Sequence, residues 1–161
     1  MNSTPLTTSP RGLALIEGFE DFRATRYLCP AGRPTIGFGH VIQGGEASPL
    51  WNATLTREQA TALLHDDVRT VEVYLNATTC RPGTSQEQFD ALVSFCFNEG
   101  VGAFDKSTLR RLFKLGNLTL AALEFVKWDK VTNPATHLLE PSKGLWARRV
   151  KERDLFLGRL K

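Results

Sequence analysis

The sequence is organised around the stretch EDFRATRYLCPAGRPTIGFGH, residues 20–40, which joins three reactive side chains to the signals of a β-hairpin. Glu20, Cys29 and Thr35 follow one another at intervals of nine and six residues. The run TIGFGH that begins at Thr35 alternates as a strand does, and residues 30–34, PAGRP, are typical of a turn. The stretch therefore predicts a hairpin that forms one wall of a cleft.

A helix is expected directly before this hairpin. Ser9 is a suitable N-cap, Pro10 suits the first helical position, and apolar residues recur at helical spacing as far as Glu20. We expect a helix over residues 10–20 with Glu20 in its last turn, where the helix dipole and burial would both raise the pKa of its carboxyl group. A carboxyl group that stays protonated near neutral pH can act as the general acid in glycoside cleavage. The alternative is an exposed helix-end acid paired with a nearby arginine.

The order Glu20, eight residues, Cys29, five residues, Thr35 resembles the catalytic signature of phage lysozymes of glycoside hydrolase family 24, in which the second position is Asp or Cys. One residue departs from that pattern, because Asp21 stands where family members usually have Gly. Glu17 is a rival for the first position, but the residue nine positions after it is an arginine, so the spacing selects Glu20. Further segments agree with the family in order: residues 56–60, 88–95, 97–98, 107–109, 128, 144–145 and 148–149.

The resemblance implies an α+β, lysozyme-like fold with a small β-hairpin lobe, a larger helical lobe, a long helix that joins them and a cleft between them. It also implies an endolysin, a muramidase that hydrolyses the β-1,4 bond between N-acetylmuramic acid and N-acetylglucosamine in bacterial peptidoglycan and so lyses the host cell. Glu20 would protonate the leaving oxygen, Cys29 would assist the attacking water or the oxocarbenium-like centre, and Thr35 would hold that water. The helical lobe would add substrate contacts from Phe104, Trp128 and Arg148. We expect a monomer that needs no cofactor and no metal.

The length of 161 residues indicates a single domain. Its expected parts are a polar tail over 1–9, a small lobe over 10–56, a linking helix over 57–75 and a helical lobe over 76–161. Capping boxes at Thr56 and Ser85 mark the starts of two helices. Further helices are expected at about 85–98, 106–115, 118–127 and 143–157.

The last of these helices carries both apolar and basic residues. Leu145, Trp146, Val150 and Phe156 are its expected buried positions, whereas the pair Arg148 and Arg149 is typical of a solvated face.

Asp67 stands inside the apolar stripe of the linking helix, three residues after Leu64 and four after Leu63. A buried acid needs a partner. His40, at the end of the hairpin, is the nearest candidate along the chain, so we predict a structural ion pair between His40 and Asp67. The alternatives are that Asp67 accepts from the backbone or meets an arginine.

Composition and charge limit the partners and the cellular location that we expect for this protein. The chain is 42% hydrophobic and 23% charged, with a net charge of +3, as is ordinary for a soluble globular protein. Residues 143–161 hold seven Lys and Arg against two acids, but no nucleic-acid reading motif accompanies them, so nucleic acid is not an expected partner. No membrane-spanning run and no signal-peptide pattern is visible. We expect synthesis in the host bacterial cytoplasm and action on the cell wall after release.

The three cysteines, Cys29, Cys80 and Cys96, are too few for a disulfide scaffold and lack the spacing of a zinc site. Cys29 can act as a base only if its pKa is lowered, for which Arg26 and Arg33 are close enough in sequence. As a neutral thiol it could only orient water, and as an inert residue it would merely fill a turn.

Two further functions remain open. One is a Cys-His peptidase that uses Cys29 and His40, and the other is a non-catalytic module that binds the cell wall.

Overall fold

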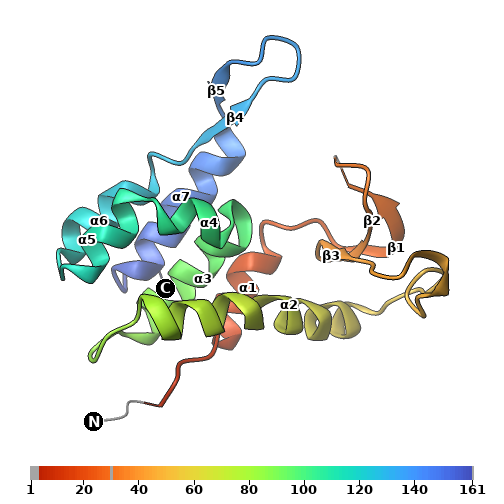
Figure 1. The fold of residues 1–161 in the computed structure, drawn as a ribbon, viewed down its shortest axis with the longest axis horizontal. Coiled ribbons are helices and arrows are strands. Elements are labelled where there is room, and N and C mark those ends of the chain that lie inside the picture. Colours follow the sequence, from red (N-terminus) through yellow and green to blue (C-terminus); the bar gives the residue numbers. More distant parts are fainter. Residues whose placement is uncertain (1–3, 30, 161) are drawn as a thin grey trace.

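The computed structural model describes residues 4–29 and 31–160, which form a small sheet lobe and a larger helical lobe joined by one long helix (Figure 1). The sheet lobe follows helix α1 and holds an antiparallel sheet in the strand order β1-β2-β3. A short 3-10 helix, η1, comes after the sheet, and α2 then runs beneath both lobes. The bounds are α1 Pro10–Glu17, β1 Arg23–Leu28, β2 Pro34–Gly37, β3 His40–Val41, η1 Gly45–Ala47 and α2 Arg57–Thr78.

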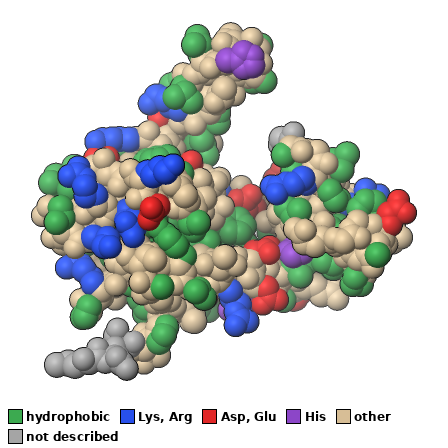
Figure 2. Space-filling view, viewed as in Figure 1, with side chains coloured by type: hydrophobic (Ala, Val, Ile, Leu, Met, Phe, Trp, Pro, Cys, Tyr) green, Lys and Arg blue, Asp and Glu red, His purple; other side chains and the backbone are tan. Residues whose placement is uncertain are grey.

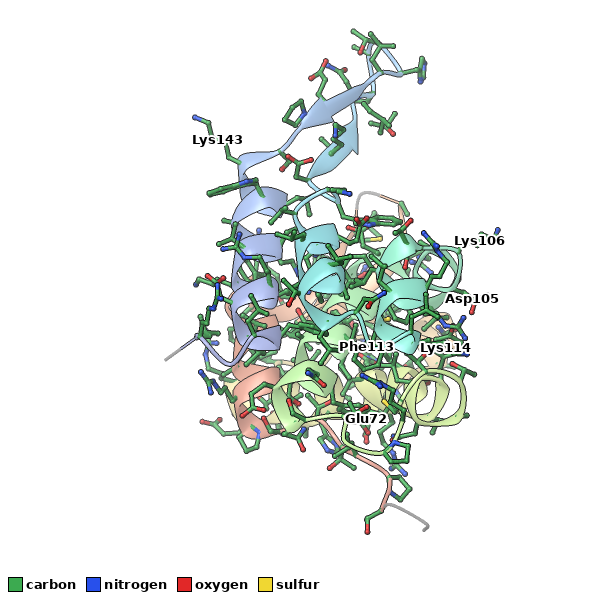
Figure 3. The ribbon with its side chains drawn as sticks, turned by 90° about the vertical axis from the view of Figure 1, so that its left-hand side faces the viewer. Glu72, Asp105, Lys106, Phe113, Lys114 and Lys143 are labelled. Carbon is green, nitrogen blue, oxygen red and sulfur yellow. The ribbon has the colours of Figure 1, made fainter. Side chains whose placement is uncertain are left out.

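The helical lobe is built around α3, in which every residue from Phe89 to Cys96 is buried. Helices α1, α2 and α7 all pack against it, and Phe113 of α5 points into the same core (Figure 3). A hairpin of β4 and β5 projects from this lobe above the start of α7 (Figures 1 and 3). The bounds are α3 Gln86–Glu99, α4 Val101–Asp105, α5 Thr108–Lys114, α6 Leu118–Phe125, β4 Lys130–Thr132, β5 Leu139–Pro141 and α7 Lys143–Phe156.

The linking helix forms where the sequence predicts it. Thr56 and Gln59 make both hydrogen bonds of a capping box, and so satisfy backbone groups that the first turn leaves unpaired. The predicted apolar stripe faces the core: Ala60, Leu64, Val68, Val71 and Leu75 are buried, and Leu63 is half-buried. The predicted capping box at Ser85 is also confirmed and begins α3.

Helix α1 is shorter than expected and ends at Glu17. Gly18 follows as the C-cap, and glycine is a poor helix former. The N–H of Glu20 still donates to the carbonyl of Ile16, at 3.2 Å, so the chain turns tightly before it enters β1. The prediction that Glu20 lies in the last helical turn is therefore wrong, and Glu20 stands in the connection between α1 and β1.

The tail and α1 belong to the helical side of the molecule. The backbone N–H and the hydroxyl of Thr8 both donate to Glu72 of α2, each at 2.6 Å. The N–H of Ser9, the N-cap of α1, donates to Asp90 of α3 at 3.0 Å. These bonds tie the tail and the start of α1 to α2 and α3.

Helix α7 differs most from expectation. Trp146 is 54% exposed, whereas Arg148, Arg149 and Glu152 are 3%, 0% and 0% exposed. The predicted solvated arginine face is wrong because α7 packs along the buried helix α3. The short helix α4 and the β4–β5 hairpin were not expected either, and both strands of that hairpin are exposed along their length, without the buried alternation that predicts a strand. Within residues 4–29 and 31–160, no helix combines the length and the apolar character needed to cross a membrane.

Candidate active site

An open cleft with a volume of about 840 Å³ lies between the sheet lobe and the helical lobe. The space-filling view shows this hollow, with acidic and histidine side chains beside it (Figure 2). Glu20, Cys29 and Thr35 all line the cleft, so the fold brings together the three residues that the sequence singled out. They come from the α1–β1 connection, the end of β1 and β2.

Glu20 reaches the cleft beside an arginine of the helical lobe. The Nη1 group of Arg148 donates to Glu20 Oε1 at 2.7 Å, and the Glu20 side chain remains 27% exposed. The expected apolar surroundings are therefore replaced on one side by a positive charge. The rival acid, Glu17, turns towards α2, where it accepts a hydrogen bond from the hydroxyl of Thr61 at 2.6 Å.

Cys29 is held at the mouth of the hairpin by backbone groups. Its N–H donates to the carbonyl of Arg33 at 3.0 Å, and its carbonyl accepts from Gly32 at 2.7 Å. The positive φ of Gly32, 73°, is one that a residue with a Cβ rarely adopts. The backbone N–H of Arg33 is the main cause that lowers the pKa of the Cys29 thiol from its ordinary value of 9.0, and the N–H of Ala31 and the hydroxyl of Thr35 act in the same direction.

The two arginines proposed to assist Cys29 behave differently. Hydrogen bonding by the Arg33 side chain also helps to lower the pKa of Cys29. Arg26, in contrast, stacks on Trp51 with its guanidinium carbon 4.2 Å from the ring centroid, and it donates to the Trp51 carbonyl. The backbone N–H groups of the turn are thus the main reason why the pKa of Cys29 is lowered.

Thr35 is buried in β2, and its hydroxyl donates to the carbonyl of Arg33 at 2.9 Å. It pairs across the ladder with Tyr27, which also lines the cleft. Burial raises the pKa of Tyr27, and the negative charges of Glu20 and Cys29 raise it further. Tyr27 was missed in the sequence, although it stands two residues before Cys29 and so belongs to the same strand face.

The predicted pair of His40 and Asp67 is confirmed. His40 Nδ1 lies 2.9 Å and 3.1 Å from the two carboxylate oxygens of Asp67, and the contact ties β3 to α2 at the edge of the cleft. Burial raises the pKa of Asp67, and the hydrogen bond and charge of His40 oppose that rise. In the described part of the chain, no cluster of His, Cys, Asp and Glu side chains has the arrangement of a metal site.

The helical-lobe residues proposed as substrate contacts are engaged elsewhere. Phe104 is fully buried against Phe95, which leaves no ring surface for a substrate. Trp128 also packs edge-on against Phe95, at 5.3 Å between ring centroids, and is only partly buried. Arg148 contacts Glu20 rather than open solvent. On this side of the cleft the lining comes instead from Phe97 and Asn98, at the end of α3, which the sequence marked only as part of the resemblance.

Comparisons with known proteins agree with this geometry. The family model described as phage lysozyme matches residues 17–152. An endolysin of Acyrthosiphon pisum secondary endosymbiont phage 1 is 37% identical over 92% of this chain and 96% of its own length. An endolysin of Salmonella phage P22 is 35% identical over 93% of this chain and 97% of its own. Among solved structures, the muramidase domain of SpmX from Asticcacaulis excentricus superposes with a TM-score of 0.82 at 34% identity, over 94% of this chain and 97% of that one.

Proposed function

This chain belongs to the phage lysozyme family, and from that premise we propose that Glu20, Cys29 and Thr35 carry out the cleavage of a glycan strand of bacterial peptidoglycan. The protein is a glycoside hydrolase of the lysozyme type and acts as an endolysin on the cell wall. The bond that it breaks is the β-1,4 link between N-acetylmuramic acid and N-acetylglucosamine. The observation that carries the proposal is that one cleft is lined by all three residues.

Glu20 acts as the general acid. Its side chain is open to the cleft on one face and bonded to Arg148 on the other, so the carboxyl group keeps a fixed position while a sugar approaches. Glu20 protonates the glycosidic oxygen as the bond to the leaving sugar breaks. The Arg148 guanidinium then stabilises the carboxylate that remains after the proton has left.

Cys29 and Thr35 handle the attacking water. The hydroxyl of Thr35 donates to the carbonyl of Arg33, so its oxygen is free to accept a hydrogen bond from a water molecule. Cys29, with its lowered pKa, takes up that water's other proton as a thiolate base. Before it takes up that proton, the negative charge of the thiolate also favours the oxocarbenium-like centre of the sugar.

The structure has one feature that a Cys-His peptidase needs, an oriented histidine, but lacks a second, the action of that histidine on the thiol. Asp67 orients the imidazole of His40, as a Cys-His hydrolase requires. His40 is not, however, among the groups that act on the Cys29 thiol, whose lowered pKa comes from Arg33, Ala31 and Thr35. The pair of His40 and Asp67 is therefore better explained as a tie between β3 and α2.

Product analysis tests the proposed function. Purified sacculi are digested with the parent protein, and reducing ends and free amino groups are measured in the same samples. We expect new reducing ends and no new amino groups. New amino groups alone would establish the peptidase, and neither product would establish a wall-binding module.

A further inference from the structure

A buried group of charged residues lies behind Glu20. It consists of Arg148, Arg149 and Glu152 on successive turns of α7, and is called here the α7 charge cluster. Glu152 is fully buried and its carboxylate meets both arginines, with Oε1 3.2 Å from Arg148 Nε and Oε2 3.1 Å from Arg149 Nε. The hydroxyl of Ser94 on α3 also donates to Glu152, at 2.7 Å. Nothing in the proposed chemistry uses this carboxylate.

Arg148 connects the cluster to the cleft. One edge of its guanidinium faces Glu152 through Nε, while Nη1 bonds to Glu20 at 2.7 Å. Its Nη2 donates to the backbone carbonyl of Ser94 at 3.4 Å. A guanidinium is planar and presents its donors in a fixed fork, so the three bonds together set its orientation and leave it shared between two carboxylates.

We propose that Glu152 is a positioning residue for the general acid: it holds Arg148 in place and takes a share of its charge, which keeps Glu20 able to carry a proton. This inference rests on the proposed role of Glu20. Glu152 is fully buried, so it cannot touch a sugar and must act through Arg148.

The charges at the site require such a partner. The Arg148 guanidinium, 2.7 Å from Glu20, places a full positive charge beside the group that must donate a proton to the substrate. A second carboxylate on the same guanidinium reduces the positive potential at Glu20. The interaction is strong because Arg148 and Glu152 are both buried, where screening by water is weak.

The remaining charged groups near the site do not replace Glu152. On α7 and α3, Arg149 is bonded to Glu99 and Asn98, and from the sheet lobe the cleft is faced by Tyr27, Cys29, His40 and Arg33, with Asp67 on α2. Asp21, beside Glu20, is exposed. Glu152 is the carboxylate that shares Arg148 with Glu20 among the described residues.

Burial raises the pKa of Glu152, while the two guanidinium groups and the Ser94 hydroxyl oppose that rise. Burial is the larger effect, so the pKa of Glu152 stays above its ordinary value. Oε2 of Glu152 and Nε of Arg149 face each other without an aligned hydrogen bond, so the contact to Arg149 is mainly one of charge, and the aligned bonds of Glu152 go to Arg148 and Ser94.

The variant Glu152→Gln tests the inference because it keeps the shape and the acceptor oxygen for Arg148 and Ser94, removes the charge, and replaces the oxygen that faces Arg149 by an NH2 group. Reducing-end release is measured from pH 4 to 9 for the parent and the variant. With Arg148 no longer shared, the ionised form of Glu20 is stabilised, so the alkaline limb of the kcat/KM profile moves to lower pH by about one unit. At a pH above that limb kcat falls about tenfold, while KM stays within about twofold because no substrate contact changes.

Glu99→Gln is the matched control. Glu99 carries the other carboxylate of the arginine group but bonds to Arg149 and not to Arg148. We expect its pH profile to superpose on that of the parent. An equal shift in both variants, or no shift in Glu152→Gln, overturns the inference and leaves Glu152 a structural residue.

A second variant covers the case in which Glu152→Gln does not fold. Glu152→Gln/Arg149→Met removes the ion pair as a whole and leaves no unpaired buried charge, yet it still frees Arg148. Its alkaline limb should move in the same direction by a smaller amount, and an unchanged limb counts against the inference. Parent protein that releases no reducing ends would overturn the proposed function itself, which separates that failure from a failure of the role of Glu152.

Discussion

The sheet wall of the cleft positions Cys29 and Thr35 with backbone groups, whereas the helical wall positions Glu20 with buried side-chain charges. In the sheet wall a tight turn presents its N–H groups to a thiol that stays near solvent. In the helical wall Arg148 reaches Glu20 out of a cluster whose other members are fully buried. The first wall should therefore tolerate side-chain changes without loss of stability, and the second should not.

Breaking the α7 charge cluster should give the largest effect on stability. Arg149→Met keeps the apolar stem but removes the charge that Glu152 faces at 3.1 Å and the bond to Asn98 at 2.7 Å. Removal of one partner of a buried ion pair typically costs about 3–5 kcal/mol. Urea unfolding at pH 7 measures the loss. The matched change in the sheet wall is Arg33→Met, an exposed arginine, which should leave the unfolding midpoint almost unchanged, and equal losses would contradict the contrast between the walls.

Glu20→Gln should cause the largest loss of activity with little loss of stability. The amide keeps the shape and an acceptor for Arg148 but has no proton to donate, so reducing-end release should fall about a hundredfold or more. Glu17→Gln is the control, since Glu17 bonds to Thr61 of α2 and should be dispensable. If the two variants exchanged behaviour, Glu17 would be the acid.

Substitutions of Cys29 test the sheet wall by itself. Cys29→Asp supplies a permanent charge and should retain substantial activity. Cys29→Ser should lose about tenfold or more, because a hydroxyl does not ionise near neutral pH. Both should unfold at the parent's midpoint, because the turn is held by backbone hydrogen bonds. Equal activity of the two variants would show that Cys29 carries no charge in the reaction.

The three cysteine thiols should differ in the pH at which they react, and Cys29 in the sheet wall should react at the lowest pH. The thiolate is the reactive form, so a group with a lowered pKa reacts at lower pH. Iodoacetamide labelling followed by peptide mass spectrometry should show a midpoint below 9.0 for Cys29 and one near 11 for Cys80, whose pKa is raised by burial. Cys96, also raised by burial, should label last. Labelling at pH 7.5 should inhibit the parent and spare Cys29→Asp, and labelling of Cys80 first would refute this order.

The smallest effect is expected where the two lobes are tied together. Asp67→Asn weakens the bond to His40, and because the Asp67 side chain is 30% exposed the loss should be about 1 kcal/mol. Urea unfolding at pH 7 measures the loss, and an unchanged unfolding midpoint would show that this bond does not help to tie β3 to α2.

The parts that could be predicted from the sequence depend on neighbours close in the chain. The turn that holds Cys29 and the capping box of α2 are each set within a few residues, and both formed as expected. The strand expected over residues 35–40 is shorter, because β2 ends at Gly37 and β3 begins at His40. The pair of His40 and Asp67 was also accessible, because an acid on an apolar helix stripe must find a partner. Helix α1 ends at Glu17 and not at Glu20, because Gly18 stops the helix even though the apolar repeat continues beyond it.

Sequence alone thus indicated the family, the capped helices α2 and α3 and the three residues that line one wall of the cleft, since these follow from local spacing, strand alternation and capping. Only the tertiary structure decided the surroundings of Glu20. Arg148 lies 128 residues away from Glu20 along the chain. The charged run RRVKE is typical of a solvated helix face, and only the packing of α7 against α3 shows that part of it is buried. The free energy of a charge depends on whether water or another charge surrounds it. Packing between distant helices settled that here, by burying Arg149 and Glu152 together and turning Arg148 towards the cleft.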